Sequence, residues 1–261
     1  MKLNDRTVLI TGGGTGIGRT LAEQLHRRGN TVIIAGRRRE MLDEVAAANP
    51  GIATLVMDVA DAASVTASAA ELVERFPELD VVINNAGVML ADDASTALAE
   101  SVLTRQVTTN LLGSIRVTNA LIDHLKTRPN AAIVYNTSTL AFTPLALFAS
   151  YSATKAALHS FALSQRFMLR DTAVEVFELV PPWVATGLVG EPDDENAMPV
   201  DEFVREALAI FETGADEVVV DAARVNRDNP GPAEHAFVNT LNEMLTPVLA
   251  QTPQVQERAA A

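Results

Sequence analysis

The sequence predicts an α/β protein in which helices cover both faces of a parallel β-sheet. Two observations lead to this fold class. Short runs of aliphatic and β-branched residues alternate with amphipathic helical patterns along most of the chain, and a glycine cluster joins the first run directly to the first helical pattern. Because parallel sheets bind ligands at the carboxyl ends of their strands, the residues that follow each strand are the first candidates for a functional site.

The alternation can be followed from the N-terminus. Residues 7–10 are apolar and β-rich, and the helical pattern behind the glycine cluster, with Leu21 and Leu25 on one face, ends at Gly29. Further strands are expected at residues 31–35, 53–57, 81–83, 132–135 and 174–179. The helices between them are expected at residues 39–48, 62–75, 95–126 and 151–170.

The chain of 261 residues shows no composition break, linker or internal repeat, so one domain spanning residues 1–261 is expected. Two segments differ from the rest. Residues 187–200 are acidic and punctuated by glycine and proline, which is typical of a loop. Residues 246–261 form a C-terminal tail that carries two prolines and ends in three alanines, and the end of this tail is expected to be frayed.

Composition excludes several classes of protein. The chain has no cysteine, which rules out a disulfide scaffold, cysteine-ligated zinc, iron–sulfur clusters and a thiol nucleophile. A net charge of −13 argues against nucleic-acid and anionic-membrane surfaces. No apolar run approaches the length of a membrane span and the N-terminus is no signal peptide, so we expect a cytoplasmic protein. The four histidines lack metal-ligand spacing, so no metal is expected.

The glycine cluster after the first strand is the first candidate binding site. Gly12, Gly16 and Gly18 lie directly between a strand and a helix, where glycines let the backbone approach a pyrophosphate and the helix N-terminus supplies N–H donors. An ordinary glycine-rich turn is the alternative interpretation. The absence of a Gly-Lys-Ser/Thr sequence excludes a P-loop for nucleoside triphosphates.

The end of the second strand indicates the kind of dinucleotide. An Asp or Glu at this point usually binds the ribose 2′-hydroxyl of NAD, whereas this chain has Gly36 followed by Arg37. A guanidinium suits a 2′-phosphate because it makes charge-assisted, bidentate hydrogen bonds. The alternative is a solvated basic helix start that also includes Arg38 and Arg39.

Ser138, Tyr151 and Lys155 form the strongest constellation. Tyr151 and Lys155 are four residues apart in a predicted helix and therefore share a face, and Ser138 comes just after a strand. A free phenol has a pKa of about 10, and a nearby ammonium is expected to lower it by about 1–3 units. The set predicts acid–base chemistry on a bound substrate, with the serine as a neutral hydrogen-bond donor.

Over about residues 5–190 the chain resembles the short-chain dehydrogenase/reductase family. The matching pieces are Thr11-Gly12-x-x-x-Gly16-x-Gly18, Asp58-Val59, Asn84-Asn85-Ala86-Gly87, Asn110, Ser138, Tyr151-x-x-x-Lys155 and Pro181-x-x-x-x-Thr186. The resemblance implies a single doubly wound Rossmann domain with a seven-stranded parallel sheet. Pro182, where the family commonly has glycine, and residues 214–218 resemble the branch of the D-alanine-transfer operon oxidoreductases.

The resemblance also implies roles for individual residues. Tyr151 would be the general acid/base, Lys155 would hold the nicotinamide ribose, and Ser138 would orient the carbonyl. Asn110 would hold a relay water. The expected cofactor-binding residues are Thr11, Gly12, Thr15, Gly16, Ile17, Gly18, Arg37, Asp58, Val59, Asn85, Ala86, Gly87, Tyr151, Lys155, Pro181, Val184 and Thr186.

The function expected from these residues is NADP(H)-dependent interconversion of a ketone or aldehyde and its alcohol, with NADP(H) preferred over NAD(H). The alternatives are an NAD-dependent alcohol dehydrogenase, which Gly36-Arg37 argues against, and a non-catalytic dinucleotide-sensing regulator, which would not need the Ser–Tyr–Lys set. A sugar-nucleotide epimerase normally shows a different glycine spacing. A homodimer or homotetramer built on the helices around residues 100–125 and 151–170 is expected from the resemblance.

The substrate is expected to be a small and mostly apolar carbonyl compound or alcohol. Apolar side chains near the Ser138–Tyr151 pair are the candidate pocket residues, with core packing as the alternative for each: Leu140, Phe142, Leu145, Phe148 and Trp183. The 187–200 loop would be the lid over this pocket, and its acidic run would disfavour anionic substrates.

Overall fold

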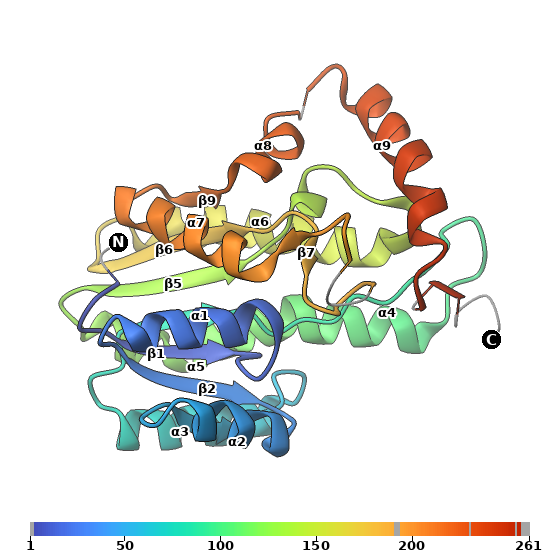
Figure 1. Ribbon diagram of the computed structural model, residues 1–261. Coiled ribbons are helices and arrows are strands. Elements are labelled where there is room, and N and C mark those ends of the chain that lie inside the picture. The colour runs from blue at the N-terminus through green and yellow to red at the C-terminus, as the bar shows by residue number, and fades with distance from the viewer. Residues whose placement is uncertain (1–2, 191–193, 230, 254, 257–261) are drawn as a thin grey trace.

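The structure is a computed structural model that describes residues 3–190, 194–229, 231–253 and 255–256. Its centre is a parallel sheet of seven strands in the order β3-β2-β1-β4-β5-β6-β9 (Figure 1). The strands are β1 (Thr7–Thr11), β2 (Thr31–Gly36), β3 (Ala53–Val56), β4 (Val81–Asn84), β5 (Ala131–Asn136), β6 (Val174–Val180) and β9 (Glu217–Val219). The predicted doubly wound α/β fold and its seven-stranded parallel sheet are confirmed.

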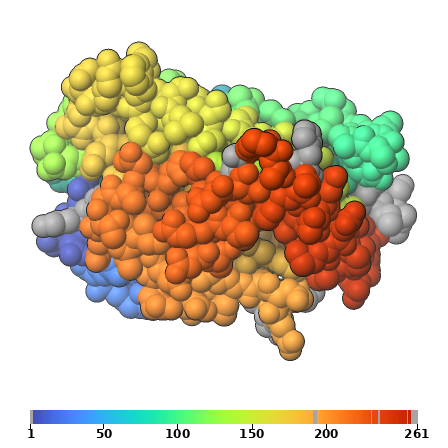
Figure 2. Space-filling model, turned by 90° about the horizontal axis from the view of Figure 1, so that it is seen from above, coloured from blue at the N-terminus to red at the C-terminus, as the bar shows by residue number. Residues whose placement is uncertain are grey.

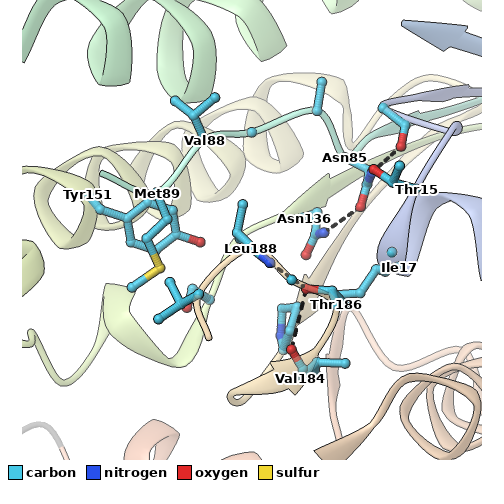
Figure 3. A pocket seen from close by; sticks show the side chains of 18 of the residues that line it. Thr15, Ile17, Asn85, Val88, Met89, Asn136, Tyr151, Val184, Thr186 and Leu188 are labelled. Carbon is cyan, nitrogen blue, oxygen red and sulfur yellow. Dashed lines mark hydrogen bonds between the residues drawn. The ribbon is translucent and has the colours of Figure 1, made fainter. Parts of the chain in front are cut away.

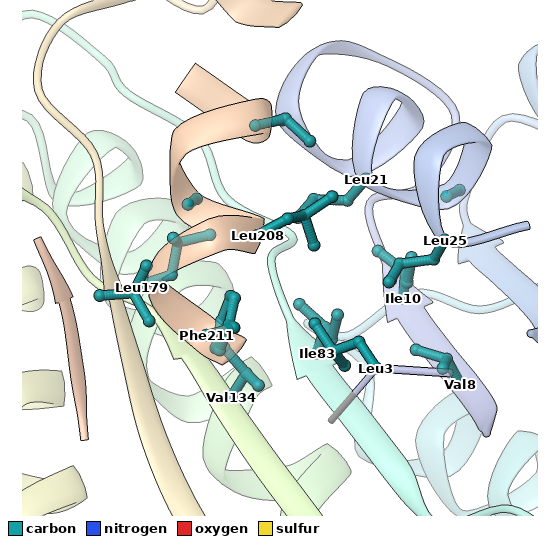
Figure 4. Packing of buried hydrophobic residues seen from close by; sticks show 14 of the residues in the cluster. Leu3, Val8, Ile10, Leu21, Leu25, Ile83, Val134, Leu179, Leu208 and Phe211 are labelled. Atoms are coloured by element: carbon teal, nitrogen blue, oxygen red, sulfur yellow. The ribbon is translucent and has the colours of Figure 1, made fainter. Parts of the chain in front are cut away.

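Successive side chains of each strand point to opposite faces of the sheet. Both faces therefore carry apolar side chains, and helices cover both. In β1, Val8 and Ile10 pack on one face, where a core cluster includes Leu21, Leu208 and other side chains of the covering helices (Figure 4). That face is covered by α1 (Gly16–Arg27), α2 (Arg39–Ala48) and α7 (Val200–Thr213). The opposite face, where Leu9 packs, is covered by α3 (Ala62–Arg75), α5 (Ser114–Lys126) and α6 (Ala149–Leu169).

The point where the chain changes direction across the sheet lies between β1 and β4. β1 pairs with β2 on one side and with β4 on the other. The first residues after β1 and β4 are therefore neighbours, and beyond them the two connections continue to helices on opposite faces of the sheet. Ligands of doubly wound sheets bind in the crevice that this arrangement opens. The glycine cluster after β1 and the polar residues after β4 therefore lie side by side.

The elements expected before residue 180 are confirmed, with one difference in the predicted 95–126 helix. That segment begins only at α4 (Glu100–Gln106), continues as a π-helix over Val107–Gly113, and then becomes α5. π-Helical turns inside α-helices are frequent at functional sites. Two 3₁₀ turns, Thr139–Ala141 and Ala146–Phe148, lead from β5 into α6.

The chain beyond residue 180 is more ordered than expected. The predicted 187–200 loop returns to the body, because β7 (Val184–Ala185) pairs with β8 (Met198–Pro199). The last helices, α8 (Asp221–Arg227) and α9 (Glu234–Leu249), form a raised edge beside the carboxyl ends of the strands (Figures 1 and 2). Residues 246–249 of the C-terminal tail end α9, and Leu249 is buried. The end of the tail, residues 257–261, lies outside the described residues.

The described part of the chain contains no helix that is both long enough and apolar enough to cross a membrane.

Candidate active site

A cavity of about 730 Å³ lies at the carboxyl edge of the sheet, where residues from β1, β2, β4, β5 and β6 end (Figure 3). Most of the residues singled out from the sequence line it. From the expected cofactor set these are Gly12, Thr15, Gly16, Ile17, Arg37, Asp58, Val59, Asn85, Ala86, Gly87, Tyr151, Lys155, Pro181, Val184 and Thr186. Ser138, from the expected catalytic set, lines it as well.

The glycine loop is shaped by close backbone packing. Gly12 and Gly16 have positive φ angles of 69° and 53°, a conformation that favours glycine. A Cβ atom on Gly18 would lie 2.3 Å from the Gly12 carbonyl oxygen, so only glycine lets α1 begin this close to the loop. Thr11 and Gly18 do not line the cavity themselves. They hold the loop, since the Thr11 hydroxyl accepts hydrogen bonds from the Asn85 and Ala86 N–H groups.

Asn85 joins the loops that follow β1, β4 and β5. Its side-chain amide donates to the Thr11 carbonyl oxygen at 3.0 Å. Its Oδ1 accepts from Nδ2 of Asn136 at 2.8 Å (Figure 3). Lys155 donates in turn to the Asn136 carbonyl oxygen at 2.6 Å. The sequence marked Asn85 as a polar residue at a strand end, and the structure shows that it fixes the neighbouring loops.

Arginines surround the end of β2. Arg37 and Arg38 line the cavity, their side chains are exposed, and neither makes an ion pair with any residue that the structure describes. Across this end, Asp58 lines the cavity while its Oδ1 accepts a hydrogen bond from the Ala60 N–H at 3.0 Å. This end therefore offers two unpaired guanidinium groups to an anionic ligand.

Ser138, Tyr151 and Lys155 meet at the other end of the cavity. The Ser138 side chain hydrogen-bonds the Tyr151 hydroxyl, and Lys155 Nζ lies 5.5 Å from the centre of the Tyr151 ring. All three side chains are at most 7% exposed. The spacing argument from the sequence therefore identified three side chains that share one site.

Burial controls the protonation of this pair. It raises the pKa of Tyr151 above that of a free phenol, and the hydrogen bond with Ser138 lowers it in part. It lowers the pKa of Lys155 to about 8. The expected lowering of the tyrosine pKa by the lysine is wrong for the protein alone, because loss of solvation outweighs every other effect on the phenol.

Asn110 lies in the π-helical turn and does not line the cavity. Its Oδ1 accepts from the Val88 N–H and its Nδ2 donates to the Val88 carbonyl oxygen, both at 2.8 Å. Nδ2 also donates to the Thr154 hydroxyl at 3.3 Å. The side chain thus holds the loop after β4 against α6.

The apolar end of the cavity differs from the expectation in part. Leu140, Leu145 and Trp183 line it, but Phe142 and Phe148 do not. Phe142 turns away from the cavity and packs between the His159 ring and the Arg227 guanidinium, and Phe148 is fully buried below the start of α6. Core packing, the alternative considered for each aromatic residue, holds for these two.

Leu188 and Val189, from the 187–200 segment expected to be the lid, also line the cavity. Sequence reasoning missed the rest of the apolar wall, which is formed by Met89, Leu241, Leu245 and Leu249. The last three recur every four residues on α9, a spacing that shows an apolar face but not what it packs against. The charged side chains among the described lining residues are Arg37, Arg38, Asp58 and Lys155, so Lys155 alone is near the apolar end. Asp194 and Glu195, from the expected acidic lid, do not line it.

A cluster outside the cavity has the composition of a metal site. Among the described residues, ligand atoms of His159, Glu178 and Glu217 lie within 4.8 Å of one another. Glu217, however, is bound by Arg227 through two hydrogen bonds of 2.6 and 3.0 Å. Glu178 is fully buried and lies 2.8 Å from His159 Nδ1 and 3.6 Å from Arg166 Nη2. Both carboxylates are thus paired with arginines, Glu178 with Arg166 and Glu217 with Arg227, in an ion-pair network.

The lining residues fit a dinucleotide. At its glycines the loop after β1 presents backbone without side chains to the cavity, and it packs closely on the loop after β4, because a Cβ on Gly12 would lie 2.9 Å from the Ala86 Cα. The cavity runs on from this loop, with the free guanidinium groups at one end and the Ser138–Tyr151–Lys155 set at the other. An extended ligand with phosphates at one end and a reactive ring at the other matches this layout.

Comparison with known proteins agrees with this layout. The family model described as short chain dehydrogenase matches residues 6–197. The "uncharacterized oxidoreductase DltE" of Bacillus subtilis is 39% identical over 234 residues, which is 87% of this chain and 93% of that protein. This relative represents the branch that Pro182 and residues 214–218 resemble.

Two further relatives carry a cofactor in their names. The NADP-dependent 3-hydroxy acid dehydrogenase YdfG of Salmonella typhi is 32% identical over 203 residues, which is 73% of this chain and 79% of that protein. The crystal structure of a short chain dehydrogenase from Burkholderia cenocepacia in complex with NADP superposes with a TM-score of 0.80 at 26% identity, covering 91% of this chain and 99% of the other.

Proposed function

The chain belongs to the short-chain dehydrogenase family, and we propose that it is an NADP(H)-dependent reductase that interconverts an apolar ketone or aldehyde and its alcohol. The observation that carries the proposal is the shared cavity of the glycine loop and the Ser138–Tyr151–Lys155 set. A dinucleotide bound at the loop after β1 would share this cavity with the three polar side chains. We further propose that residues 1–261 act as one domain.

The chain's own residues supply the proton chemistry. The bound nicotinamide ring supplies or accepts a hydride. Ser138 donates a hydrogen bond to the carbonyl oxygen of the substrate, and Tyr151 donates its phenolic proton to the same oxygen as it becomes an alkoxide. The raised pKa of Tyr151 keeps the phenol protonated at neutral pH, which is the form that reduction requires. Lys155 would hold the ribose hydroxyls of the cofactor beside the phenol.

Preference for NADP(H) is supported by the arginines after β2. Gly36 brings no carboxylate that would repel a 2′-phosphate, and Arg37 and Arg38 are free to bind one. The name of the Salmonella relative and the Burkholderia complex both include NADP, in agreement with this assignment.

Preference for an apolar substrate is supported by the lining of the cavity. Beyond Lys155, the substrate end is bounded by Leu140, Trp183 and the α9 leucines, with no described cationic side chain left to bind a carboxylate. A 3-hydroxy acid is the second candidate, because the Salmonella relative is named for that substrate. Neutral ketones and 3-oxo acids therefore belong in the same assay.

The decisive experiment is a panel of carbonyl compounds with purified protein, NADPH and NADH, followed by the loss of nicotinamide absorbance. Turnover of neutral apolar ketones or aldehydes with NADPH is expected. A 3-hydroxy acid, dicarboxylate or phosphorylated sugar as best substrate would contradict the substrate assignment. Cofactor binding without turnover of any compound would indicate a sensor, and turnover only with NADH an NAD-dependent dehydrogenase.

Variants at the site test the acid–base roles. Tyr151→Phe should retain cofactor binding and lose turnover, because it removes the hydroxyl that transfers the proton. Lys155→Ala should weaken both. If Tyr151→Phe kept more than roughly a tenth of wild-type kcat/KM, a loss below ~1.4 kcal/mol, Tyr151 would not be the acid.

A homodimer or homotetramer is proposed from an exposed apolar face. Leu163, Phe167 and Met168 on α6 are 44%, 64% and 73% exposed, and Leu112 on the neighbouring π-helical turn is 38% exposed. Large exposed side chains grouped on adjacent helices indicate a protein contact. Light scattering of wild type and of Phe167→Glu tests this, with a smaller particle expected for the variant.

A further inference from the structure

Asp92 is a buried carboxylate that the proposed reaction does not use. It is 2% exposed, and no described cationic side chain pairs with it. Its Oδ1 accepts from the Ala149 N–H at 2.7 Å, and its Oδ2 accepts from the Ser150 N–H at 2.8 Å and from the Ser150 hydroxyl. All three donors belong to the first turn of α6, directly before Tyr151. Burying an ionised carboxylate costs several kcal/mol unless such hydrogen bonds compensate.

The start of α6 has no cap of its own. The residue at the N-cap position, Phe148, offers no side-chain acceptor, and the first turn contains no acidic residue. The first N–H groups of a helix need acceptors, and an anion there also offsets the positive end of the helix dipole. Asp92 supplies both from a loop that is 57 residues away in the sequence.

The loop that carries Asp92 also forms the cavity wall. It leaves β4 through the lining residues Asn85–Met89, and the Asp92 N–H donates to the Leu147 carbonyl oxygen at 2.9 Å. Gln106 on α4 closes the connection: its Nε2 donates to the Ser150 hydroxyl and its Oε1 accepts from the Leu90 N–H. Gln106 is fully buried. The cavity wall and the tyrosine helix are thus joined by one continuous set of hydrogen bonds.

We propose that Asp92 is a positioning residue that sets the Tyr151 hydroxyl relative to the cofactor-binding loop after β4, acting through Ser150 and Gln106. This role rests on the proposed function, because it requires Tyr151 to act on the substrate. A misplacement of reacting groups by about 1 Å can cost about a hundredfold in rate, so a displaced helix start should lower kcat while cofactor binding persists.

Asp92→Asn is the sharpest variant. It keeps the shape of the side chain but places an amide donor where the Ser150 N–H and hydroxyl already donate. We expect kcat to fall by about ten- to a hundredfold, with the dissociation constant for NADPH within about twofold of wild type. Binding can be followed by the fluorescence of Trp183, the single tryptophan, which lines the cavity.

A second readout does not depend on activity. In the free protein, amide hydrogen exchange at residues 149–151 should be faster in Asp92→Asn than in wild type, because the acceptors of two of these N–H groups are altered. The matched control is Asp61→Asn, which makes the same charge change at the exposed N-cap of α3, where the Asp61 side chain accepts from the Ala63 N–H. Asparagine caps a helix about as well as aspartate, so kcat and exchange at residues 149–151 should both stay unchanged.

The outcomes separate the two proposals. Normal kcat in folded Asp92→Asn, with turnover lost in Tyr151→Phe, overturns the positioning role alone. Normal turnover in Tyr151→Phe overturns the proposed function and the positioning role together. If Asp92→Asn does not fold, Ser150→Ala removes one link of the same network: a severalfold lower kcat with unchanged NADPH affinity supports the role, and an unchanged kcat overturns it.

Discussion

The two ends of the cavity are lined by different kinds of residue. We call the end at the loops after β1, β2 and β4 the nucleotide end, and the end near Ser138, Tyr151 and α9 the substrate end. At the nucleotide end, backbone positions and small residues after β1, β2 and β4 make the surface, and the Asn85 side chain fixes the loops to one another. At the substrate end, large apolar side chains make the surface, and several come from α9, far along the chain. The shape of the nucleotide end depends on backbone conformation, and the shape of the substrate end depends on the size of its side chains. Substitutions at the nucleotide end should therefore impair cofactor binding, whereas substitutions at the substrate end should change substrate specificity and leave the enzyme active.

The largest effect is expected from a methyl group at the nucleotide end. Gly18→Ala places a Cβ 2.3 Å from the Gly12 carbonyl oxygen, so the loop and α1 must move apart. We expect NADPH affinity to fall by at least about a hundredfold, since the pyrophosphate contacts depend on that loop. Isothermal titration calorimetry gives the affinity, and thermal unfolding gives the accompanying loss of stability.

Gly29→Ala is the control for Gly18→Ala. Gly29 has a φ angle of 86° but no atom within 4 Å of an added Cβ, so alanine there adds backbone strain of about 1–2 kcal/mol without a collision. Its NADPH affinity should match wild type. Equal loss of affinity in both variants would show that general destabilisation, not the shape of the loop, is responsible.

Lys155, at the junction of the two ends, should make the stability of the cofactor-free protein depend on pH. Its pKa is about 8 in the folded protein and about 10.4 in an unfolded chain, so between these values the unfolded state binds more protons. Stability should therefore rise with pH above 8, by about 2 kcal/mol up to pH 9.5. The cost of burying the charged amine is fully present below pH 8.

Denaturant unfolding across pH 7 to 9.5 measures this rise. Lys155→Met serves as the reference, because it keeps the length of the side chain and cannot titrate. The difference in stability between the two proteins should shrink as the pH increases. A constant difference would mean that the amine is solvated and keeps its ordinary pKa.

The cofactor preference is the next effect in size. Wild type should favour NADPH over NADH by about tenfold or more in kcat/KM, since an arginine–phosphate pair is worth about 1.5–3 kcal/mol. Gly36→Asp combined with Arg37→Ala should reverse the preference, because the carboxylate accepts from the ribose hydroxyls and repels a phosphate. A Cβ at Gly36 meets only Leu42 at 3.5 Å, so the aspartate fits. A wild type that favours NADH, or neither cofactor, would show that the arginines stay in solvent.

The smallest effect is expected at the substrate end. Leu245→Ala removes part of the apolar wall, and we expect a three- to tenfold lower kcat/KM for long apolar ketones, at about 0.8 kcal/mol for each buried methylene lost, with NADPH affinity unchanged. Met244→Ala is the matched control, because Met244 is 60% exposed on the same helix. A series of methyl ketones of increasing length measures both. An equal response of the two variants would mean that α9 does not face the substrate.

This contrast also separates what could be predicted from the sequence from what could not. The nucleotide end could be predicted because each of its residues follows a strand, and strand ends are visible as apolar runs that stop at glycine or polar residues. The substrate end could not, because the contacts of α9 depend on long-range packing. Phe142 and Leu145 lie in the same segment, yet only Leu145 reaches the cavity. The segment has no regular periodicity that would have distinguished them.

The fold shows the same division. The strands up to residue 180 were predicted from their apolar runs, whereas β9 has only three residues and no pattern of its own. The π-helical turn around Asn110 is set by the side-chain clamp on Val88, and no local signal marks it. The cap that Asp92 provides for α6 bridges segments far apart in the sequence, so neither segment reveals it alone.

The two ends of the cavity are synthesised at different times, because their residues lie in different parts of the chain. The strands and loops that form the nucleotide end are complete once Thr186 has been synthesised, whereas Leu241, the first lining leucine of α9, follows 55 residues later. At about 5–20 residues per second this is a delay of about 3–11 s. During that interval the apolar wall around Leu140 and Trp183 has no α9 to cover it. The surface proposed for the dinucleotide is therefore synthesised before the wall that encloses a substrate, and a chain truncated before α9 would leave these apolar side chains exposed.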